Sequence, residues 1–304
     1  MREPESGMDK YQSMLTFVRV IETGSFSGAA RVLGVGQPAV SKAVAQLESR
    51  LKVRLLVRST HGLRPTEAGS RFFARARVAV EETDEAELAA RGENEGLTGR
   101  LRVSAATTFA RLHIIPHLPK FMADHPDLEI DVVLDDRFID LIEQGIDLSL
   151  RMGSLTDSGL VAQKLATGRR SVIATPAYLR RTSEPAHPEE LTQHEAVVYS
   201  QLPDAWVFKR SGEEVPVIVR GRARFSAAEG LRAAVLADMG LTVTSDWMFA
   251  DKLLDGSVRR VLGDWSLPSI DLWAVFPSGR MVSAKARAFS SFVQGVMAAP
   301  SLAS

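Results

Sequence analysis

Apolar and polar positions near the start of the chain alternate with the period of amphipathic helices. Between residues 8 and 21, apolar side chains return every three or four positions and share one helical face: Tyr11, Met14, Phe17, Val18 and Ile21. Gly24 breaks this pattern, and Ser25 and Ser27 are candidate N-caps of a second, short helix that ends at Gly34. The pattern therefore predicts two consecutive helices at the start of the chain.

A third helix is predicted to begin near Gly36 and Pro38, because proline is tolerated in the first helical turn. Its apolar positions share one face: Val40, Val44, Leu47 and Leu51. The opposite face carries small, polar or cationic side chains: Gln37, Ala39, Ser41, Lys42 and Gln46. Nothing on this second face favours burial, so it is available for contact with a partner.

A hairpin and a long helix are predicted next. Residues 54–58 and 63–66 have the pattern of short strands, with a tight turn at His61 and Gly62 between them. Residues 67–90 form a helix with one stripe of small and apolar positions, which indicates a coiled-coil seam and a partner helix. The predicted dimerisation residues on this stripe are Phe72, Ala76, Ala79, Val80 and Thr83. The glycine-rich, polar segment 91–99 is a predicted interdomain linker.

Beyond residue 100, the pattern changes to strands separated by helices. We predict strands at 101–104, 128–134, 147–152, 171–175, 241–245 and 271–276. We predict helices near 112–125 and at 138–144, 227–238 and 284–296. This alternation indicates an α/β domain, and the sequence contains no internal repeat.

The composition is that of a soluble globular protein, with 45% hydrophobic and 24% charged residues. A chain of 304 residues exceeds the size at which one core usually stops growing, so at least two domains are expected. The absence of cysteine excludes disulfides, thiolate zinc sites and cysteine nucleophiles. The first ten residues lack the pattern of a signal peptide, and no apolar run reaches membrane-spanning length. We therefore expect a cytoplasmic location and no membrane partner.

The formal net charge of zero hides an asymmetry along the chain. Up to Thr66 there are ten Lys and Arg residues against five acidic residues, a net charge of +5. Residues 67–95 instead hold eight acidic residues against four arginines. A basic head therefore precedes an acidic helix, and a basic head favours a nucleic-acid partner.

The polar face of the third helix has the chemistry to contact DNA bases in the major groove. Glutamine pairs with adenine edges and lysine contacts guanine or phosphate, so Gln37, Ser41 and Lys42 are candidate base contacts. The hairpin supplies candidate phosphate contacts: Arg58, His61 and Arg64. An isolated polar stripe is more often a solvated face. Here the order of helices and hairpin, the positive charge and the seam together favour DNA binding.

These segments resemble the DNA-binding head of LysR-type transcriptional regulators. The matching residues are Phe17–Ser27, Ala29–Ala30, Leu33, Gln37–Lys42, Leu47–Glu48 and Thr66–Gly69. Similar segments in the family's sensing domain are Gly99–Ser104, Pro126–Asp127, Asp147–Leu148, Arg151–Gly153 and Asp238–Trp247, so the resemblance covers nearly the whole chain. The sequence departs from the family at Gly36, His61 and Asp238, where Ser, Arg and Gly are frequent.

The resemblance implies a multidomain α+β protein with a winged helix-turn-helix, a long linker helix and a bilobed α/β effector domain like type 2 periplasmic binding proteins. The implied boundaries are a disordered tail (1–7), the head (8–66), the linker helix (67–92), a hinge (93–99) and the effector domain (100–304). Lobe 1 would span about 100–168 and 277–304, and lobe 2 about 169–276. The implied DNA contacts are Ser25, Ser27, Gln37, Pro38, Ala39, Ser41, Lys42, Arg58, His61 and Arg64.

The implied partners are double-stranded promoter DNA, a small effector and further copies of the chain. The linker helices would pair two chains, and two such dimers would form a tetramer. RNA polymerase is a further candidate partner, and no cofactor is expected.

The family binds its effector between the two lobes, and the matching first strand-to-helix loop is 104–109. Hydroxyl groups and helix-start amides in that loop suit an anionic effector. The predicted effector contacts are Ser104, Ala105, Thr107, Thr108, Arg151, Met152, Ser226 and Asp246. Ser and Thr also cap helices routinely, which is the alternative role for each of them.

Other functional classes have no supporting pattern. His113 and His117 are separated by Pro116 and lack a carboxylate that would complete a metal motif, so structural histidines are favoured. The serines of segment 24–28 are out of place for a nucleophile elbow, so we expect no enzymatic activity. A solute-binding protein without a DNA role fits the body but not the basic head. A transferase or hydrolase would need a catalytic constellation, which fold analogy cannot supply.

Overall fold

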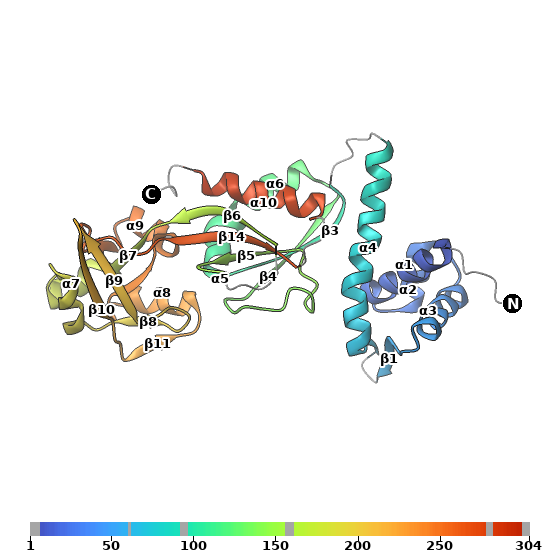
Figure 1. The fold of residues 1–304 in the computed structure, drawn as a ribbon, viewed down its shortest axis with the longest axis horizontal. Helices are drawn as coiled ribbons and strands as arrows, with labels where there is room; N and C mark the ends of the chain where they lie inside the picture. Colours follow the sequence, from blue (N-terminus) through green and yellow to red (C-terminus); the bar gives the residue numbers. More distant parts are fainter. Residues whose placement is uncertain (1–6, 60–61, 92–96, 156–160, 278–281, 300–304) are drawn as a thin grey trace. The chain divides into compact units, whose positions relative to one another are not determined.

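The computed structural model describes residues 7–59, 62–91, 97–155, 161–277 and 282–299. They form two compact units, which are described separately. The first contains the head and the long helix, and the second contains the larger sheets (Figure 1). Among the described residues, no helix combines the length and apolar character needed to cross a membrane.

The head is built from helices and one hairpin: α1 (Gly7–Thr23), α2 (Phe26–Leu33), α3 (Gln37–Leu51), β1 (Leu56–Ser59), β2 (Gly62–Pro65) and α4 (Glu67–Arg91). The predicted apolar faces meet in its core, where Phe17, Val40 and Leu47 are each at most 1% exposed. Leu51, at the end of α3, is instead exposed. The tail predicted at residues 1–7 lies outside the described residues except for Gly7, which begins α1.

The helix boundaries follow from local chemistry. The Ser25 Oγ accepts a hydrogen bond from the Gly28 N–H at 3.0 Å and caps α2, which confirms one of the two predicted caps. Helix α2 ends at Gly34, whose φ of 65° lies in the left-handed region that favours glycine. Helix α3 begins after Gly36 with Pro38 in its first turn.

Two contacts fix the hairpin to the helices on either side of it. The Glu48 Oε1 on α3 accepts hydrogen bonds from the N–H groups of Leu55 and Leu56, at 2.6 and 3.0 Å. At the start of α4, a Cβ added to Gly69 would lie 2.0 Å from the Leu55 carbonyl oxygen. Only glycine therefore lets α4 approach the strand this closely.

Part of the stripe predicted to pair two chains packs inside the head. Ala76 and Val80 are each 2% exposed and form a cluster with Val18 of α1. Phe72 packs edge-on against Phe17, with ring centroids 5.4 Å apart. Ala79 and Thr83 remain half-buried. Phe72, Ala76 and Val80 thus hold α4 on α1 of the same chain.

The second unit begins with a five-stranded sheet in the order β4-β3-β5-β14-β6 (Figure 1). Its strands are β3 (Gly99–Ala105), β4 (Leu128–Leu134), β5 (Leu148–Met152), β6 (Val161–Gly168) and β14 (Ile270–Phe276). β3 is parallel to β4 and β5, and β14 is antiparallel to β5 and β6. We call this sheet and its helices lobe 1. Strand β14 belongs to it, so the chain returns to lobe 1 before the predicted boundary at 276/277.

The helical segments of lobe 1 differ from the single helix predicted near 112–125. They are α5 (Thr107–Phe109), a π-helical turn (Ala110–Ile114), a 3₁₀ turn (Ile115–His117), α6 (Leu118–Asp124) and, at the end of the chain, α10 (Ala284–Met297). Pro116 interrupts the regular helical hydrogen bonding, because it has no N–H. The helix predicted at 138–144 is a turn instead, since the Asp140 Oδ1 accepts from the N–H groups of Ile142 and Glu143.

The second lobe, lobe 2, has a core of its own around Val172, Leu191 and Leu241. Its strands are β7 (Arg170–Ala174), β8 (Val197–Tyr199), β9 (Ala205–Arg210), β10 (Glu213–Ile218), β11 (Ala223–Phe225), β12 (Thr242–Ser245) and β13 (Arg259–Val261). Its helices are α7 (Pro176–Thr182), a 3₁₀ helix (Pro188–Gln193), α8 (Ala228–Leu236), a 3₁₀ turn (Asp246–Phe249) and α9 (Ala250–Leu254). Asp238 adopts a left-handed φ of 59°, a conformation that Asp tolerates better than most residues.

Candidate functional site

Helix α3 presents two faces of opposite character. Val40 and Val44 are buried in the head, whereas Gln37, Ala39 and Lys42 on the other face are exposed. Of the remaining predicted DNA contacts on this helix, Pro38 is exposed and Ser41 is half-buried. The exposed hydrogen-bonding groups lie in the first two turns of α3. In helices that enter the major groove of DNA, this is the part that reaches the base edges.

The predicted contacts outside α3 have mixed outcomes. Ser27 is exposed at the start of α2, whereas the oxygen of Ser25 is engaged in capping. The antiparallel hairpin β1–β2 forms as predicted and carries Arg64 exposed on β2. Arg58 lies on β1 opposite Leu63, and its side chain is outside the described part, as is the whole of His61.

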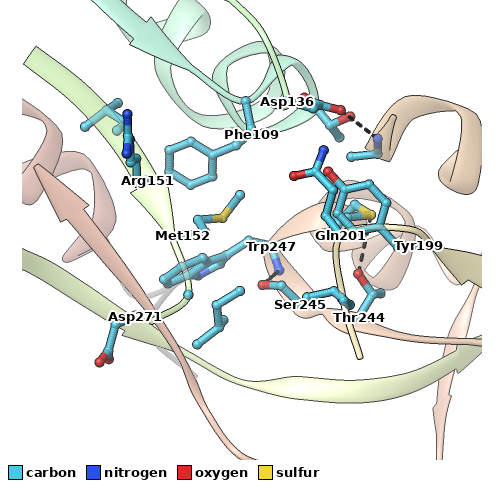
Figure 2. Close-up of a pocket in the computed structure, with 18 of the residues that line it drawn as sticks. Phe109, Asp136, Arg151, Met152, Tyr199, Gln201, Thr244, Ser245, Trp247 and Asp271 are labelled. Carbon is cyan, nitrogen blue, oxygen red and sulfur yellow. Dashed lines mark hydrogen bonds between the residues drawn. The ribbon is translucent and has the colours of Figure 1, made fainter. Parts of the chain in front are cut away.

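A cavity of about 560 Å³ opens between lobe 1 and lobe 2. Its walls carry aromatic and sulfur-containing side chains from both lobes, including Phe109 after β3, Met152 on β5 and Trp247 after β12 (Figure 2). A volume of this size accommodates a small organic molecule, and mostly apolar walls with a few polar groups are typical of ligand pockets.

Hydroxyl and amide groups line the same cavity. Tyr199, Gln201, Thr244 and Ser245 contribute them from lobe 2, with Tyr199 and Gln201 side by side in Figure 2. Burial, assisted by the nearby Asp136 carboxylate, raises the pKa of Tyr199 well above its ordinary value, so its phenol stays protonated. These groups can both donate and accept hydrogen bonds.

Asp136 is a cavity residue that the sequence analysis missed. It follows β4, and its Oδ1 accepts a hydrogen bond from the Thr107 N–H at 2.8 Å, while its Oδ2 accepts from the Ala228 N–H at 2.7 Å. Thr107 begins α5 in lobe 1 and Ala228 begins α8 in lobe 2. One carboxylate therefore accepts hydrogen bonds from the first N–H groups of both helices. Its position just after a strand of the sheet was the only available signal.

Further contacts join the lobes beside Asp136. The Thr108 Oγ1 donates to the Glu229 Oε2 at 2.9 Å, and Arg111 forms an ion pair with the same carboxylate at 3.0 Å. On another side of the cavity, the His113 ring nitrogen Nε2 lies 2.7 Å from the Trp247 carbonyl oxygen. The arrangement of the lobes thus depends on a small set of polar contacts.

Three arginines line the cavity, and each contacts protein groups. Arg137 forms a two-pronged contact with Asp135, at 3.1 and 2.9 Å. Arg151 donates to the Ile139 carbonyl oxygen at 3.0 Å and stacks on the Phe138 ring. Arg170 donates to the carbonyl oxygens of Pro268 and Ser269, both at 3.2 Å. Burial lowers the pKa of both Arg151 and Arg170.

The predicted effector contacts divide into two groups. Five line the cavity: Ser104, Ala105, Thr108, Arg151 and Met152. Thr107 does not line it, although its N–H binds Asp136. Ser226 is exposed outside the lining, and Asp246 is buried in an ion pair with Arg260 at 2.7 Å. Thr107, Ser226 and Asp246 thus lie outside the lining of this cavity, because strand and helix ends alone do not fix where side chains point.

The histidine pair has a structural role at His113, which is 3% exposed and packs on Phe109. Burial lowers the pKa of His113, although the hydrogen bond to Trp247 partly opposes this shift. His117 is exposed. No group of three or more His, Asp or Glu side chains suited to a metal ion occurs among the described residues.

A basic head with an exposed polar helix, followed in the same chain by a bilobed domain with a ligand-sized cavity, is the organisation of a transcriptional regulator. Comparisons with known proteins agree: residues 11–70 match the bacterial regulatory helix-turn-helix protein of the lysR family, and residues 94–298 match the LysR substrate binding domain. The chain belongs to the LysR family of transcriptional regulators.

Relatives share this organisation over nearly the full length. An HTH-type transcriptional regulator of Xanthomonas campestris pv. campestris (strain 8004) is 39% identical over 92% of this chain and 83% of its own. The solved structure of CrgA, a LysR-type transcriptional regulator from Neisseria meningitidis, is similar with a TM-score of 0.61 at 31% identity, over 97% of this chain and 100% of that one. The full-length structure of AphB, a virulence activator of Vibrio cholerae, has a TM-score of 0.57 at 30% identity, over 93% and 98% of the two chains.

Proposed function

We propose that α3 enters the major groove of promoter DNA and that a small effector bound in the cavity modulates this binding. The observation that carries the DNA-binding part is the exposed polar face of α3, opposite a face on which Val40, Val44 and Leu47 are buried. Gln37, Ser41 and Lys42 contact base edges in this proposal.

The flanking residues supply affinity more than sequence preference. Ser27 at the start of α2 and Arg64 on β2 are exposed, as phosphate contacts must be. Arg58 and His61 complete this set as sequence-based candidates. Lysine and arginine contacts of this kind make binding sensitive to salt.

The effector acts through the relative arrangement of the two lobes. A ligand that touches both Phe109 of lobe 1 and Trp247 of lobe 2 stabilises one arrangement over others. The polar contacts of Asp136 and Glu229 hold the lobes in the present arrangement, which is the arrangement that the ligand favours or opposes in this proposal. No catalytic activity is part of this proposal, and the named relatives are transcriptional regulators.

We propose that two chains pair through α4 to form a dimer and that two of these dimers form a tetramer. Because Phe72, Ala76 and Val80 pack on α1, the half-buried Ala79 and Thr83 remain as the candidate dimer contacts on the original stripe. RNA polymerase remains a further candidate partner on promoter DNA.

The effector part is tested by a thermal-shift screen of small organic molecules, followed by titration of each hit into the protein bound to fluorescent promoter DNA. A true effector should shift the DNA affinity by about fivefold to 150-fold, the usual range of coupling between sites. Met152→Trp, which fills the cavity from β5, should abolish the effect of the hit and keep DNA binding. Hits that alter DNA affinity equally in this variant would contradict the cavity as the effector site.

A further inference from the structure

The Asp136 carboxylate takes the place in the cleft where an anionic ligand would be expected. The N–H groups at the first turn of a helix attract negative charge, and Thr107 and Ala228 direct two such groups at one point. Both are satisfied by Asp136, one by each carboxylate oxygen, at 2.8 and 2.7 Å. A ligand carboxylate would have to displace this side chain.

The residues before the two helices explain why Asp136 is needed. The N-cap residues are Ala106 for α5 and Ala227 for α8, and neither makes a side-chain capping hydrogen bond. Alanine has no acceptor that could satisfy the first free N–H groups. Asp136, in the segment after β4, supplies the acceptor that both helices lack. Because α5 belongs to lobe 1 and α8 to lobe 2, its two hydrogen bonds also connect the lobes.

The formal charges of the residues that line the cavity, Asp136 included, sum to zero. The lining contains three arginines and three aspartates: Arg137, Arg151, Arg170, Asp135, Asp136 and Asp271. Asp271 is itself paired, with Lys164 at 2.9 Å and Thr167 at 2.7 Å. The lining as a whole thus carries no formal excess of either charge.

The space beside Asp136 has an aromatic wall, in which the rings of Phe109 and Trp247 pack on each other. Phe109, Met152 and Trp247 face the same space in Figure 2, and the Phe109 and Trp247 ring centroids are 6.1 Å apart. Tyr199 and Gln201 lie at the Asp136 side of this space and can hydrogen-bond an uncharged polar substituent.

We propose that Asp136 is the internal anion of this cleft and that the effector is an uncharged, aromatic-sized molecule that binds beside it against Phe109, Met152 and Trp247. This inference rests on the proposed effector role of the cavity. It reverses the expectation from the loop 104–109 alone, which suited an anionic effector.

The test uses acetate and benzoate as carboxylate probes, with chloride at equal ionic strength as the reference. Calorimetric titration of the full chain should show no saturable binding of either probe. In Asp136→Ala the two N–H groups are free, so both probes should bind saturably, with an affinity at least about tenfold above the detection limit of the titration. They should also raise the thermal midpoint of this variant.

Amide hydrogen exchange locates the binding. Protection of the peptides that contain Thr107 and Ala228 should fall in Asp136→Ala and return with acetate. Asp136→Asn is the matched variant expected to fold, since it has the same shape and retains one acceptor oxygen. It should lose protection at only one of the two peptides and gain no acetate binding.

Three results would overturn the inference: saturable binding of either carboxylate by the wild type, no carboxylate binding by folded Asp136→Ala, or unchanged protection in Asp136→Asn. Arg170 is the control for the first result, because its buried Nε lacks a hydrogen-bond partner among the described residues. Wild-type binding that is lost in Arg170→Gln would assign the anion site to Arg170 instead. None of these results depends on an effector being known, so they are distinguishable from failure of the ligand screen.

Discussion

The head and the bilobed domain build their binding surfaces in different ways. In the head, a single helix, α3, supplies the proposed base contacts from consecutive turns. In the bilobed domain, the two lobes that enclose the cavity meet through residues far apart in sequence, such as Thr108 and Glu229, which are 121 residues apart yet hydrogen-bonded. The first surface depends on holding one helix in place, and the second depends on how two lobes meet.

This difference indicates at which positions a substitution should affect each region most. The head depends on close backbone contacts around its hairpin, such as those of Glu48 and Gly69. The bilobed domain depends on bridging side chains, such as Asp136 and His113. Substitutions at these positions should therefore separate the two regions experimentally.

The largest expected effect is that of Gly69→Ala in the head. Its Cβ would overlap the Leu55 carbonyl oxygen, and the backbone of β1 or α4 would have to move. We expect a loss of about 3 kcal/mol in the free energy of unfolding of the head, at the upper end of overpacking effects. Chemical denaturation followed by circular dichroism measures this change.

Gly295→Ala in α10 is the matched control. This glycine is exposed within a helix, and an added Cβ would meet nothing within 4 Å. The same substitution should here stabilise the bilobed domain by about 0.5–1 kcal/mol through helix propensity. Equal effects of the two substitutions would contradict the close approach of α4 to the hairpin.

A smaller effect is expected for Glu48→Gln, which removes the charge from the acceptor of the Leu55 and Leu56 N–H groups. The loss should be about 1–2 kcal/mol, because hydrogen bonds to charged groups are stronger than neutral ones. Glu22→Gln is the control, since Glu22 is exposed and pairs with Arg19 in a surface ion pair at 2.8 Å. It should cost about 0.5 kcal/mol or less. A Glu48→Gln variant as stable as the wild type would contradict a stabilising role for the hydrogen bonds between Glu48 and the start of the hairpin.

The smallest effect concerns the pH dependence of the bilobed domain. Burial lowers the pKa of His113 in the folded state, so the unfolded chain binds a proton there more readily. Stability is therefore retained above the ordinary histidine pKa of about 6.5 and falls as the pH drops below it. His194, whose pKa burial also lowers, adds to the same trend.

Thermal midpoints measured between neutral pH and about pH 5 test this dependence, the range below the unfolded pKa. His113→Gln should show a shallower decline than the wild type, although its stability at neutral pH is lower. His117→Gln, at an exposed histidine of the same segment, serves as the control and should retain the wild-type slope. An unchanged slope in His113→Gln would contradict a buried, neutral His113.

The sequence predicted the helices of the head well because their signals are local. Gly34, Pro38 and the apolar spacing of α3 act within a few residues, and each appears where expected. The cleft was predicted less completely. Asp136 carries no local signal for its two long-range hydrogen bonds, and Asp246 was assigned to the cavity although Arg260 holds it in an ion pair elsewhere.

The same contrast explains the missed elements of lobe 2. The hairpin of β9 and β10 and the parallel pair of β8 and β11 are short strands whose stability depends on packing against distant residues. The helix predicted at 138–144 failed because Asp140 offers the backbone a competing turn.

The central claim, that α3 contacts promoter DNA, is tested most directly by fluorescence anisotropy with labelled intergenic DNA from beside the gene. The wild type should bind with an affinity that falls as salt rises. Gln37→Ala should reduce the preference for this DNA over unrelated DNA by about tenfold, and Lys42→Ala should weaken binding further. Lys120→Ala, an exposed lysine of α6, should bind as the wild type does. Equal affinity, preference and salt dependence in Gln37→Ala, Lys42→Ala and the wild type would contradict the claim.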